Sequence, residues 1–388
     1  MAADNDRFVK TTHAGWFSRV KSALGGLIVG PIIIFGSGYL LTWNEGHSAK
    51  MIEALTQGRR EVVTVASDRV DPAMEGKLVY LTGRATTDEV LEDALFGVSK
   101  NALSLRRDSE MYQWQEEKDE RTEKQVGGGE TTTVTYTYQK GWSSSLTRSS
   151  NFGQPEGHTN PAEFRFPSET FVAKDATLGV FRLDKELVAK VSDADPIVLA
   201  PSHGVASVQG AKVLDGGVYI GADSAQPAVG DMRIRFSAVA PQVVSIVGAQ
   251  RGGTLALFQS QNGVYIGLVS SGVRTAQELF DAELQLNTLI TWGIRLLGLF
   301  LMFLGFAITL SLFSVLADVV PFIGGVVQFG TNLIAFLCAL AVWAATIAIA
   351  WFAYRPVHAA ILIAVVLGIA AWVYTRRSKK VAGLAKAA

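Results

Sequence analysis

A run of 23 residues without a charged side chain, Ser22–Asn44, most restricts how this chain can fold. At a rise of about 1.5 Å per residue, a helix of this length covers the roughly 30 Å hydrocarbon core of a bilayer. Trp16 and Trp43 bracket the run, and tryptophan is enriched at membrane–water interfaces. A cleavable signal peptide is the alternative, but the run is too long and lacks a small-residue cleavage site. The sequence therefore predicts a transmembrane helix at 22–44.

Three more uncharged runs lie near the C-terminus: 296–317, 319–354 and 356–375. The middle run is too long for one span. Its first part holds residues that interrupt apolar helices: Pro321, Gly324, Gly325, Gln328 and Asn332. We therefore predict transmembrane helices at 289–317, 333–354 and 357–375, with a loop, an interfacial helix or a re-entrant segment at 318–332. Arg355 and Pro356 then form a tight turn between the last two spans, because proline starts a helix well.

Basic residues at both ends of the chain predict the orientation of the four spans. Four precede the first span, at Arg7, Lys10, Arg19 and Lys21, and a group of four comes directly after the last one, at Arg376, Arg377, Lys379 and Lys380. The positive-inside rule then makes the N-terminal segment 1–21, the loop 318–332 and the basic tail 376–388 cytoplasmic. The segment 45–288 is expected outside. For a bacterial protein this means the inner membrane with a periplasmic domain, and for a eukaryotic one the endoplasmic reticulum or inner nuclear membrane.

Redox and glycosylation signals are sparse. The one cysteine, Cys338, lies inside an apolar run, so no disulfide forms within the chain, and no Asn-x-Ser/Thr acceptor site occurs. Both observations weakly favour a bacterial source. The charge is balanced, with 35 basic and 35 acidic residues, which gives no sign of nucleic-acid binding.

The predicted spans hold no Asp, Glu, Lys or Arg near the membrane centre, which argues against a pump or a coupled transporter. Polar residues such as Gln328 and Asn332 could line a pore built from several copies, although satisfied polar groups near a helix end are the simpler interpretation. Small residues recur at helical spacing, and they are candidates for close helix packing within or between subunits. They are Gly26, Gly30, Ala360, Ala364 and Gly368.

The segment 45–288 is predicted to be a β-rich domain on helical stalks, so the fold class is an α+β membrane protein. Thr275 and Glu278 form a capping box that starts one long helix over 275–316. Strands are expected at 61–66, 77–83, 216–221, 231–239, 242–249, 254–259 and 263–269. The strands 103–116 and 131–142 form a long hairpin, for which the charged tract 116–124 and Gly127–Gly129 predict a solvated, mobile tip. One internal helix is expected at 181–191.

Motifs for catalysis are missing from the sequence. It contains no phosphate-binding loop, nucleophile elbow, zinc-protease motif, Cys-x-x-Cys pair or dinucleotide fingerprint. Glu156 and His158 lie two residues apart without an evident third ligand, so a structured loop explains them better than a metal site does. Arginines at 106, 107, 233 and 235 read as solvent-facing strand positions that could contact lipid headgroups. We predict neither an enzyme nor a cofactor.

Several short strings, in order over residues 40–375, resemble the transmembrane protein 43 (LUMA) family. They are Asn44-Glu45-Gly46, Glu75-Gly76-Lys77-Leu78-Val79, Leu105-Arg106-Arg107, Glu110-Met111-Tyr112-Gln113-Trp114, Asn151-Phe152, Gly157-His158-Thr159-Asn160-Pro161, Val229-Gly230-Asp231-Met232-Arg233, Gln250-Arg251-Gly252, Thr291-Trp292-Gly293 and Tyr354-Arg355-Pro356. One departure is the stretch 319–332, which lacks the basic residues of the animal members.

The resemblance implies four spans, a large lumenal domain and cytosolic termini. It also implies a membrane organiser that self-associates, with lamina-linked partners in animals, and a channel role has been proposed for the family. No catalytic residues are assigned to it. We therefore expect a homo-oligomeric scaffold whose partners are lipids and other membrane proteins. The alternatives are a cation-permeable channel built from several copies and a receptor that binds lipids or partners through its outer domain.

Overall fold

The computed structural model describes residues 6–201, 203, 205 and 208–357. The chain divides into two compact units. The first, here called the β-rich unit, contains residues 6–12, 54–123 and 131–284; the second, the helical unit, contains 13–53, 124–130 and 285–357. The predicted fourth span, 357–375, and the predicted packing residues Ala360, Ala364 and Gly368 lie beyond the described residues, except for position 357.

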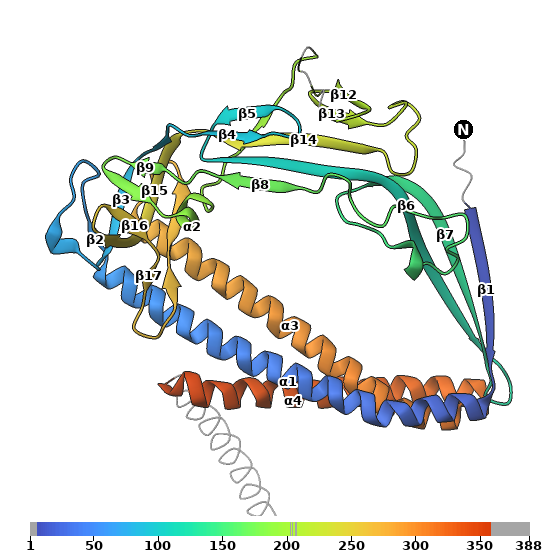
Figure 1. Cartoon of the computed structure of the whole chain (residues 1–388). Helices are drawn as coiled ribbons and strands as arrows, with labels where there is room; N and C mark the ends of the chain where they lie inside the picture. The colour runs from blue at the N-terminus through green and yellow to red at the C-terminus, as the bar shows by residue number, and fades with distance from the viewer. Residues whose placement is uncertain (1–5, 202, 204, 206–207, 358–388) are drawn as a thin grey trace, which may run out of the picture. The chain divides into compact units, whose positions relative to one another are not determined.

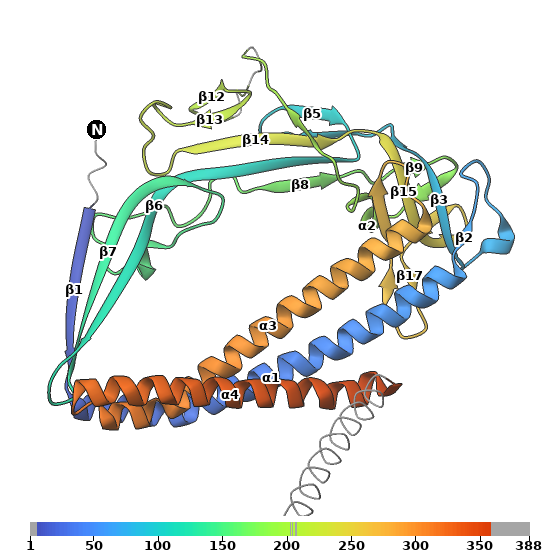
Figure 2. The ribbon, with the colours of Figure 1, turned by 180° about the vertical axis from the view of Figure 1, so that it is seen from behind.

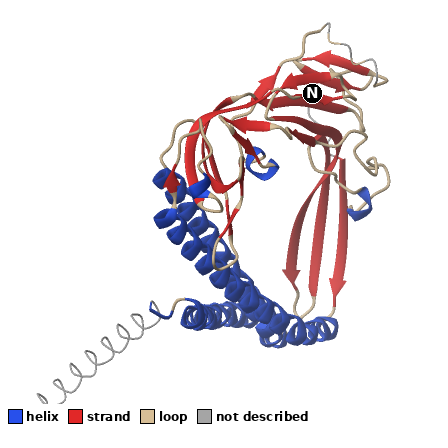
Figure 3. Ribbon diagram, turned by 60° about the vertical axis from the view of Figure 1, so that its left-hand side comes forward, coloured by secondary structure: helices blue, strands red, loops and turns tan. Residues whose placement is uncertain are grey.

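Two large sheets build the β-rich unit. In the first, the strand order is β1-β7-β6-β14-β13-β12, with β8 paired to β6 and β11 paired to β14. The bounds of these strands are Asp6–Ala14 (β1), Ser104–Lys124 (β6), Glu130–Ser143 (β7), Glu169–Val172 (β8), Asp195–Ile197 (β11), Ala211–Leu214 (β12), Gly217–Ile220 (β13) and Met232–Val239 (β14). The long strands β1, β7 and β6 are neighbours in this sheet (Figures 1 and 3).

Five strands of the second sheet close into a small barrel in the order β3-β15-β16-β10-β9-β3. β10 and β16 pair in parallel, and the other four pairs are antiparallel. β2 and β19 add to β3 and β15. The bounds are Val63–Thr64 (β2), Leu78–Thr87 (β3), Ala176–Leu178 (β9), Phe181–Leu183 (β10), Gln242–Arg251 (β15), Thr254–Ala256 (β16) and Leu268–Ser271 (β19).

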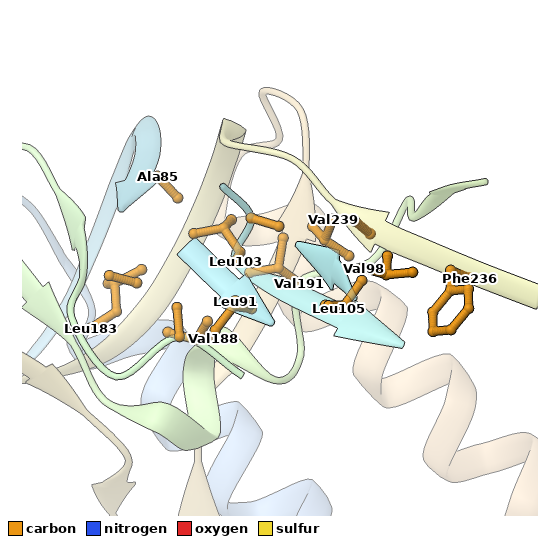
Figure 4. Close-up of a cluster of buried hydrophobic side chains, with 14 of the residues drawn as sticks. Ala85, Leu91, Val98, Leu103, Leu105, Leu183, Val188, Val191, Phe236 and Val239 are labelled. Carbon is orange, nitrogen blue, oxygen red and sulfur yellow. The ribbon is translucent and has the colours of Figure 1, made fainter. Parts of the chain in front are cut away.

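Smaller elements complete this unit. They are the hairpin β4–β5 (Val90–Asp93 and Val98–Asn101), the pair β17–β18 (Phe258–Gln259 and Tyr265–Ile266), the 3-10 turns Pro72–Met74 and Ser149–Asn151, and the one-turn helix α2 (Lys185–Val188). The core lies where strands of both sheets meet α2, and its side chains include Ala85, Leu103, Leu183, Val188 and Phe236 (Figure 4). Burial of this apolar surface is the main term that favours folding of the unit.

Three long helices form the helical unit: α1 (Trp16–Glu61), α3 (Ala276–Ala317) and α4 (Pro321–Tyr354). All three are long and apolar enough to cross a membrane. They share a small core of Leu41, Met302 and Ala339, with Phe303 and Trp343 packed against it. Figures 1 and 2 show the three helices side by side in this unit. α1 and α3 continue without interruption into the β-rich unit, at Ala54 and Leu284.

Most of the predicted elements are confirmed, including the strands from 77 onwards, the long hairpin and the helix that starts after Thr275. There the Thr275 amide donates to Glu278, and the Glu278 amide donates to the Thr275 hydroxyl, at 2.7 and 3.2 Å. The β-rich domain and three apolar helices are thus established, whereas four transmembrane helices are not.

Two expectations about these elements were wrong. No loop or re-entrant turn separates 318–332 from a helix at 333–354, because α4 runs unbroken from Pro321, which occupies a first-turn position where proline needs no hydrogen-bond donor. The expected helix 181–191 is instead strand β10 followed by the single turn α2, since Phe181 and Leu183 alternate into the core. Within the segment 1–21, residues 6–14 form strand β1, which the sequence did not predict.

Candidate functional site: two ionic clusters in the helical unit

The first cluster, here called the Glu45 cluster, joins all three helices. Arg295 of α3 donates to both carboxylate oxygens of Glu45 on α1, from Nε at 2.6 Å and from Nη2 at 2.9 Å. The Trp351 indole of α4 donates to the same carboxylate at 2.9 Å. Glu45 is fully buried and Arg295 is 6% exposed. A bidentate arrangement of this kind is the strongest form of ion pair, because charge and geometry both match.

Polar and aromatic side chains surround this pair. The Thr291 hydroxyl and the Asn287 amide of α3 donate to the Ser48 hydroxyl of α1, and Arg355 donates to it at 3.2 Å. The Arg295 guanidinium also lies over the Trp292 ring, 4.7 Å from its centroid. Trp292 and Arg295 lie where the apolar run of α3 begins, and tryptophan at such a boundary is typical of a membrane interface. The cluster therefore combines a fixed ion pair with interface residues.

The second cluster, here called the Asp318 cluster, lies where α1 begins and α3 ends. Asp318 is fully buried and accepts from two cations: Arg19 Nη2 at 2.5 Å and Lys124 Nζ at 2.7 Å. Arg19 also forms an ion pair with Glu130 at 2.9 Å. Lys124 and Glu130 belong to the tip of the β6–β7 hairpin, which contributes residues 124–130 to the helical unit. The four charges balance, which lowers the cost of burying them.

Glycine allows the hairpin tip to approach the helices. Gly128 has φ +79°, a conformation that side chains disfavour, and a Cβ there would collide with the Trp16 indole. Its carbonyl accepts from Arg19 at 2.6 Å, and the Gly127 amide donates to the Val319 carbonyl at 3.1 Å. The hairpin was predicted correctly, and its tip is exposed at Val126 as expected, but contacts at Lys124, Gly127 and Gly128 fix it to the helices.

Two of the predicted helix-packing residues lie between the clusters. A Cβ on Gly26 would be 2.8 Å from the Ile308 carbonyl oxygen, and one on Gly30 would be 2.5 Å from that of Gly305. On α3, a Cβ on Gly305 would in turn be 2.9 Å from the Gly30 carbonyl oxygen. The small residues thus bring the backbones of α1 and α3 together within one chain, as small-xxx-small patterns do in lipid.

The other predicted residues play lesser parts. Gln328 is exposed and accepts from Lys124 at 2.8 Å, Asn332 is exposed, and Arg355 follows the end of α4. Cys338 is a free, half-buried thiol in α4. Sequence reasoning did not select Arg19, Glu45, Arg295 or Asp318. The sequence does contain a signal for these pairs. Arg19 and Glu45 flank the apolar run of α1, and Arg295 and Asp318 flank that of α3. When the two helices pack antiparallel, a basic residue therefore meets an acidic one at each end of the runs.

A pocket of about 480 Å³ lies beside Arg19, between α1 and α3. Small side chains line it on α1, at Ser22, Ala23 and Gly26, and Ser311 faces it from α3. All three guanidinium nitrogens of Arg19 are engaged by Gly128, Asp318 and Glu130. The pocket therefore offers hydroxyls and apolar atoms rather than a free charge.

The candidate residues of the β-rich unit are held within its packing. Arg107 was expected to face solvent, but it is 1% exposed and pairs with Asp93 and Glu169 at 2.5 and 2.8 Å. The ring of His158 contacts the Gln154 carbonyl and the Asp6 carboxylate, at 3.0 and 3.1 Å. Among the described residues, no group of three or more His, Cys, Asp or Glu is placed to hold a metal ion.

Comparisons with known proteins agree with the resemblance seen in the sequence. The model of the transmembrane protein 43 family matches residues 111–356. Transmembrane protein 43 of Rattus norvegicus is 32% identical over 363 residues, which cover 90% of this chain and 89% of the relative. The Homo sapiens protein is 31% identical, with 91% of each chain covered, and the Drosophila melanogaster homolog is 31% identical, with 87% of this chain and 90% of the relative covered. No solved structure matches. The chain belongs to the transmembrane protein 43 family.

Proposed function

We propose that this protein is a non-enzymatic scaffold that organises membranes by self-association. One observation supports the proposal most: the helices of the helical unit are held to one another by buried ion pairs, while most of their apolar surface is exposed. Buried ion pairs hold α1 and α3 together at both ends of their apolar runs, so the charged groups inside the unit serve packing. A fixed body of this kind suits a structural role better than a gated one.

Most of the apolar helix surface is available to lipid or to another copy of the chain. In the apolar windows of α1, α3 and α4, 22%, 17% and 22% of the residues are buried. Small residues are also exposed on these faces: a Cβ on Gly25, Gly36 or Gly325 would meet no atom within 4 Å. In lipid, close approach at small residues drives helix association. The proposal therefore assigns self-association to these exposed faces.

The oligomeric state tests the proposal most directly. Mass photometry of the protein in nanodiscs is expected to show an oligomer, and Gly36→Leu is expected to shift it toward the monomer. Gly15→Leu is the matched control, because Gly15 precedes α1 and also meets no atom within 4 Å. A strict monomer at all concentrations would exclude the scaffold.

A conductance measurement separates the scaffold from a channel. Purified protein in liposomes is expected to show no reproducible, ion-selective current. A selective current that Gln328→Ala or Asn332→Ala abolishes would instead identify a pore lined by α4.

A further inference from the structure

Both ends of α1 are fixed in the β-rich unit. Only Gly15 separates α1 from β1, and β1 is a strand of the first sheet through its pairing with β7. Side chains secure β1 there: Phe8 stacks on Tyr136 with 6.0 Å between ring centroids, and Asp6 contacts the buried His158. At its other end α1 reaches Glu61, and β2 follows at once and pairs with β3 in the second sheet.

The end of α3 is linked to the same unit through Lys124, which contacts Asp318 and belongs to strand β6. Asp318 holds Lys124, the last residue of β6, and the residues before it are strongly charged from Glu116 to Glu123. Charged strands of an open sheet cannot lie in hydrocarbon, because their backbone and side chains would lose hydration. The Asp318 cluster must therefore lie on the side of the membrane that the charged strands occupy.

The two sheets that hold the ends of α1 share one hydrophobic core, and a folded unit with a single core cannot lie on both sides of a bilayer. We infer that α1 enters and leaves the membrane on the same side, and that the helical unit rests in one leaflet with its exposed apolar face against the lipid acyl chains. This replaces the expected arrangement in which 22–44 crosses the bilayer and separates residues 1–21 from 45–288. The inference concerns membrane sidedness and is independent of the scaffold proposal.

The pattern of exposure along α1 agrees with this placement. Most of its large exposed apolar side chains recur at intervals of three and four residues, which keeps them on one helix face. They are Leu24, Ile28, Ile32, Phe35, Tyr39 and Trp43, and the exposed Leu27 and Val29 lie at the two edges of this face. The opposite face is buried against α3 at Gly26, Gly30 and Ser37, where the Ser37 hydroxyl donates to the Gly298 carbonyl at 2.8 Å. A helix that lies in the plane of a membrane buries one such face among the lipids.

Cysteine labelling in sealed membranes tests the inference. Cys338→Ala removes the native thiol, and single cysteines are then placed at three exposed positions: Thr11 in β1, Val126 in the hairpin tip and Asp68 after α1. Spheroplasts of an expressing bacterium give every molecule one orientation. A membrane-impermeant maleimide is expected to modify all three positions before permeabilisation, or none of them until permeabilisation.

The four-span arrangement gives the opposite result. It requires the cysteine at position 11 to be protected when the one at position 68 is modified. Modification of position 68 while position 11 or position 126 stays protected would overturn the inference. A cytoplasmic host protein with a reactive cysteine serves as the control for sealing. Size-exclusion chromatography shows that each variant is folded, and the exposed sites make a folding defect unexpected.

Depth measurements provide a second test. A fluorophore is attached at Leu24, Ile32 or Tyr39, and the lipids carry bromine at one fixed acyl depth. A helix in the membrane plane gives the same quenching at all three positions. A helix that crosses the bilayer gives strong quenching for Ile32 alone when the bromine lies near the bilayer centre, and that result would also overturn the inference.

Discussion

The Arg19 guanidinium and the Asp318 carboxylate lie 2.5 Å apart, although the two residues are separated by 299 positions in the chain. This ion pair closes α1 onto the end of α3, and both side chains are at least nine-tenths buried. Lys124 is the third member, at 2.7 Å from the same carboxylate. A single acidic residue therefore holds the start of one helix and the tip of a hairpin.

Asp318→Asn is expected to release the hairpin tip. The substitution leaves the buried Arg19 and the partly buried Lys124 with Glu130 as a counter-charge but without Asp318, which costs more than the loss of one hydrogen bond. Limited trypsin digestion should then cleave faster after Arg121 and Lys124. Asp119→Asn is the matched control, since Asp119 is exposed and its contact with Arg121 is 3.6 Å long. Equal cleavage rates in the two variants would contradict the role assigned to Asp318.

Glu45→Gln is expected to destabilise the helical unit by on the order of 3 kcal/mol, because Arg295 loses its bidentate partner while it stays buried. Asp281→Asn breaks another pair between α1 and α3, Arg59–Asp281, whose side chains are 39% and 49% exposed. An exposed pair of this kind contributes less than about 1 kcal/mol. Thermal unfolding in detergent should therefore show a large loss for the first variant and a small one for the second. A similar loss of stability in both variants would contradict the expectation that the buried pair contributes more than the exposed one.

Gly30→Val is expected to separate α1 from α3, because its side chain would meet the Gly305 backbone and the Thr309 hydroxyl. Overpacking of this kind costs about 1–3 kcal/mol. Gly36→Val introduces the same side chain in the same helix, where a Cβ meets no atom within 4 Å. Thermal unfolding in detergent should therefore show a larger loss of stability for the first variant than for the second. Equal losses would show that the glycine contact is not required.

Alkaline pH is expected to destabilise the β-rich unit through Tyr138. Burial, followed by the hydrogen bond to Glu116, raises the pKa of Tyr138 from 10.0 to about 12. Because the pKa is higher in the folded protein than in the unfolded chain, the neutral hydroxyl contributes its full stabilisation below pH 10. That contribution is lost as the pH rises from 10 to about 12.

Tyr138→Phe removes this contribution and should lose less stability over the same interval of pH. Tyr265→Phe is the control, because Tyr265 is 58% exposed. Melting temperatures at pH 8, 10 and 12 measure the difference. A pH dependence identical to that of the unmodified protein would contradict the assignment to Tyr138.

Local and periodic features of the fold could be predicted from the sequence. Uncharged runs identified the apolar parts of α1 and α3, and the Thr275–Glu278 capping box placed the start of α3 correctly. Segments rich in Val, Thr and Tyr identified β3 and β7. These signals are carried by neighbours within one element, so no knowledge of tertiary contacts is needed.

Features that depend on distant partners could not be predicted in this way. The basic segment before α1 becomes strand β1 only because β7 lies beside it, and an isolated short strand carries no strong signal of its own. Gly324 and Gly325 suggested a break, yet α4 continues through them because packing outweighs their weak helix propensity. The ionic clusters likewise join residues that come together only when α1 and α3 align.

The pairing of β1 with β7 also sets an order of events during synthesis. Residues 6–14 leave the ribosome long before 130–143 exist, so β1 has no partner while the apolar run of α1 is already emerging. The nascent helix must therefore meet the membrane or a chaperone while its N-terminal flank is still unpaired. When the hairpin is complete, residues 6–14 can pair with β7 and join the sheet. Only this pairing would fix the side of the membrane on which α1 begins.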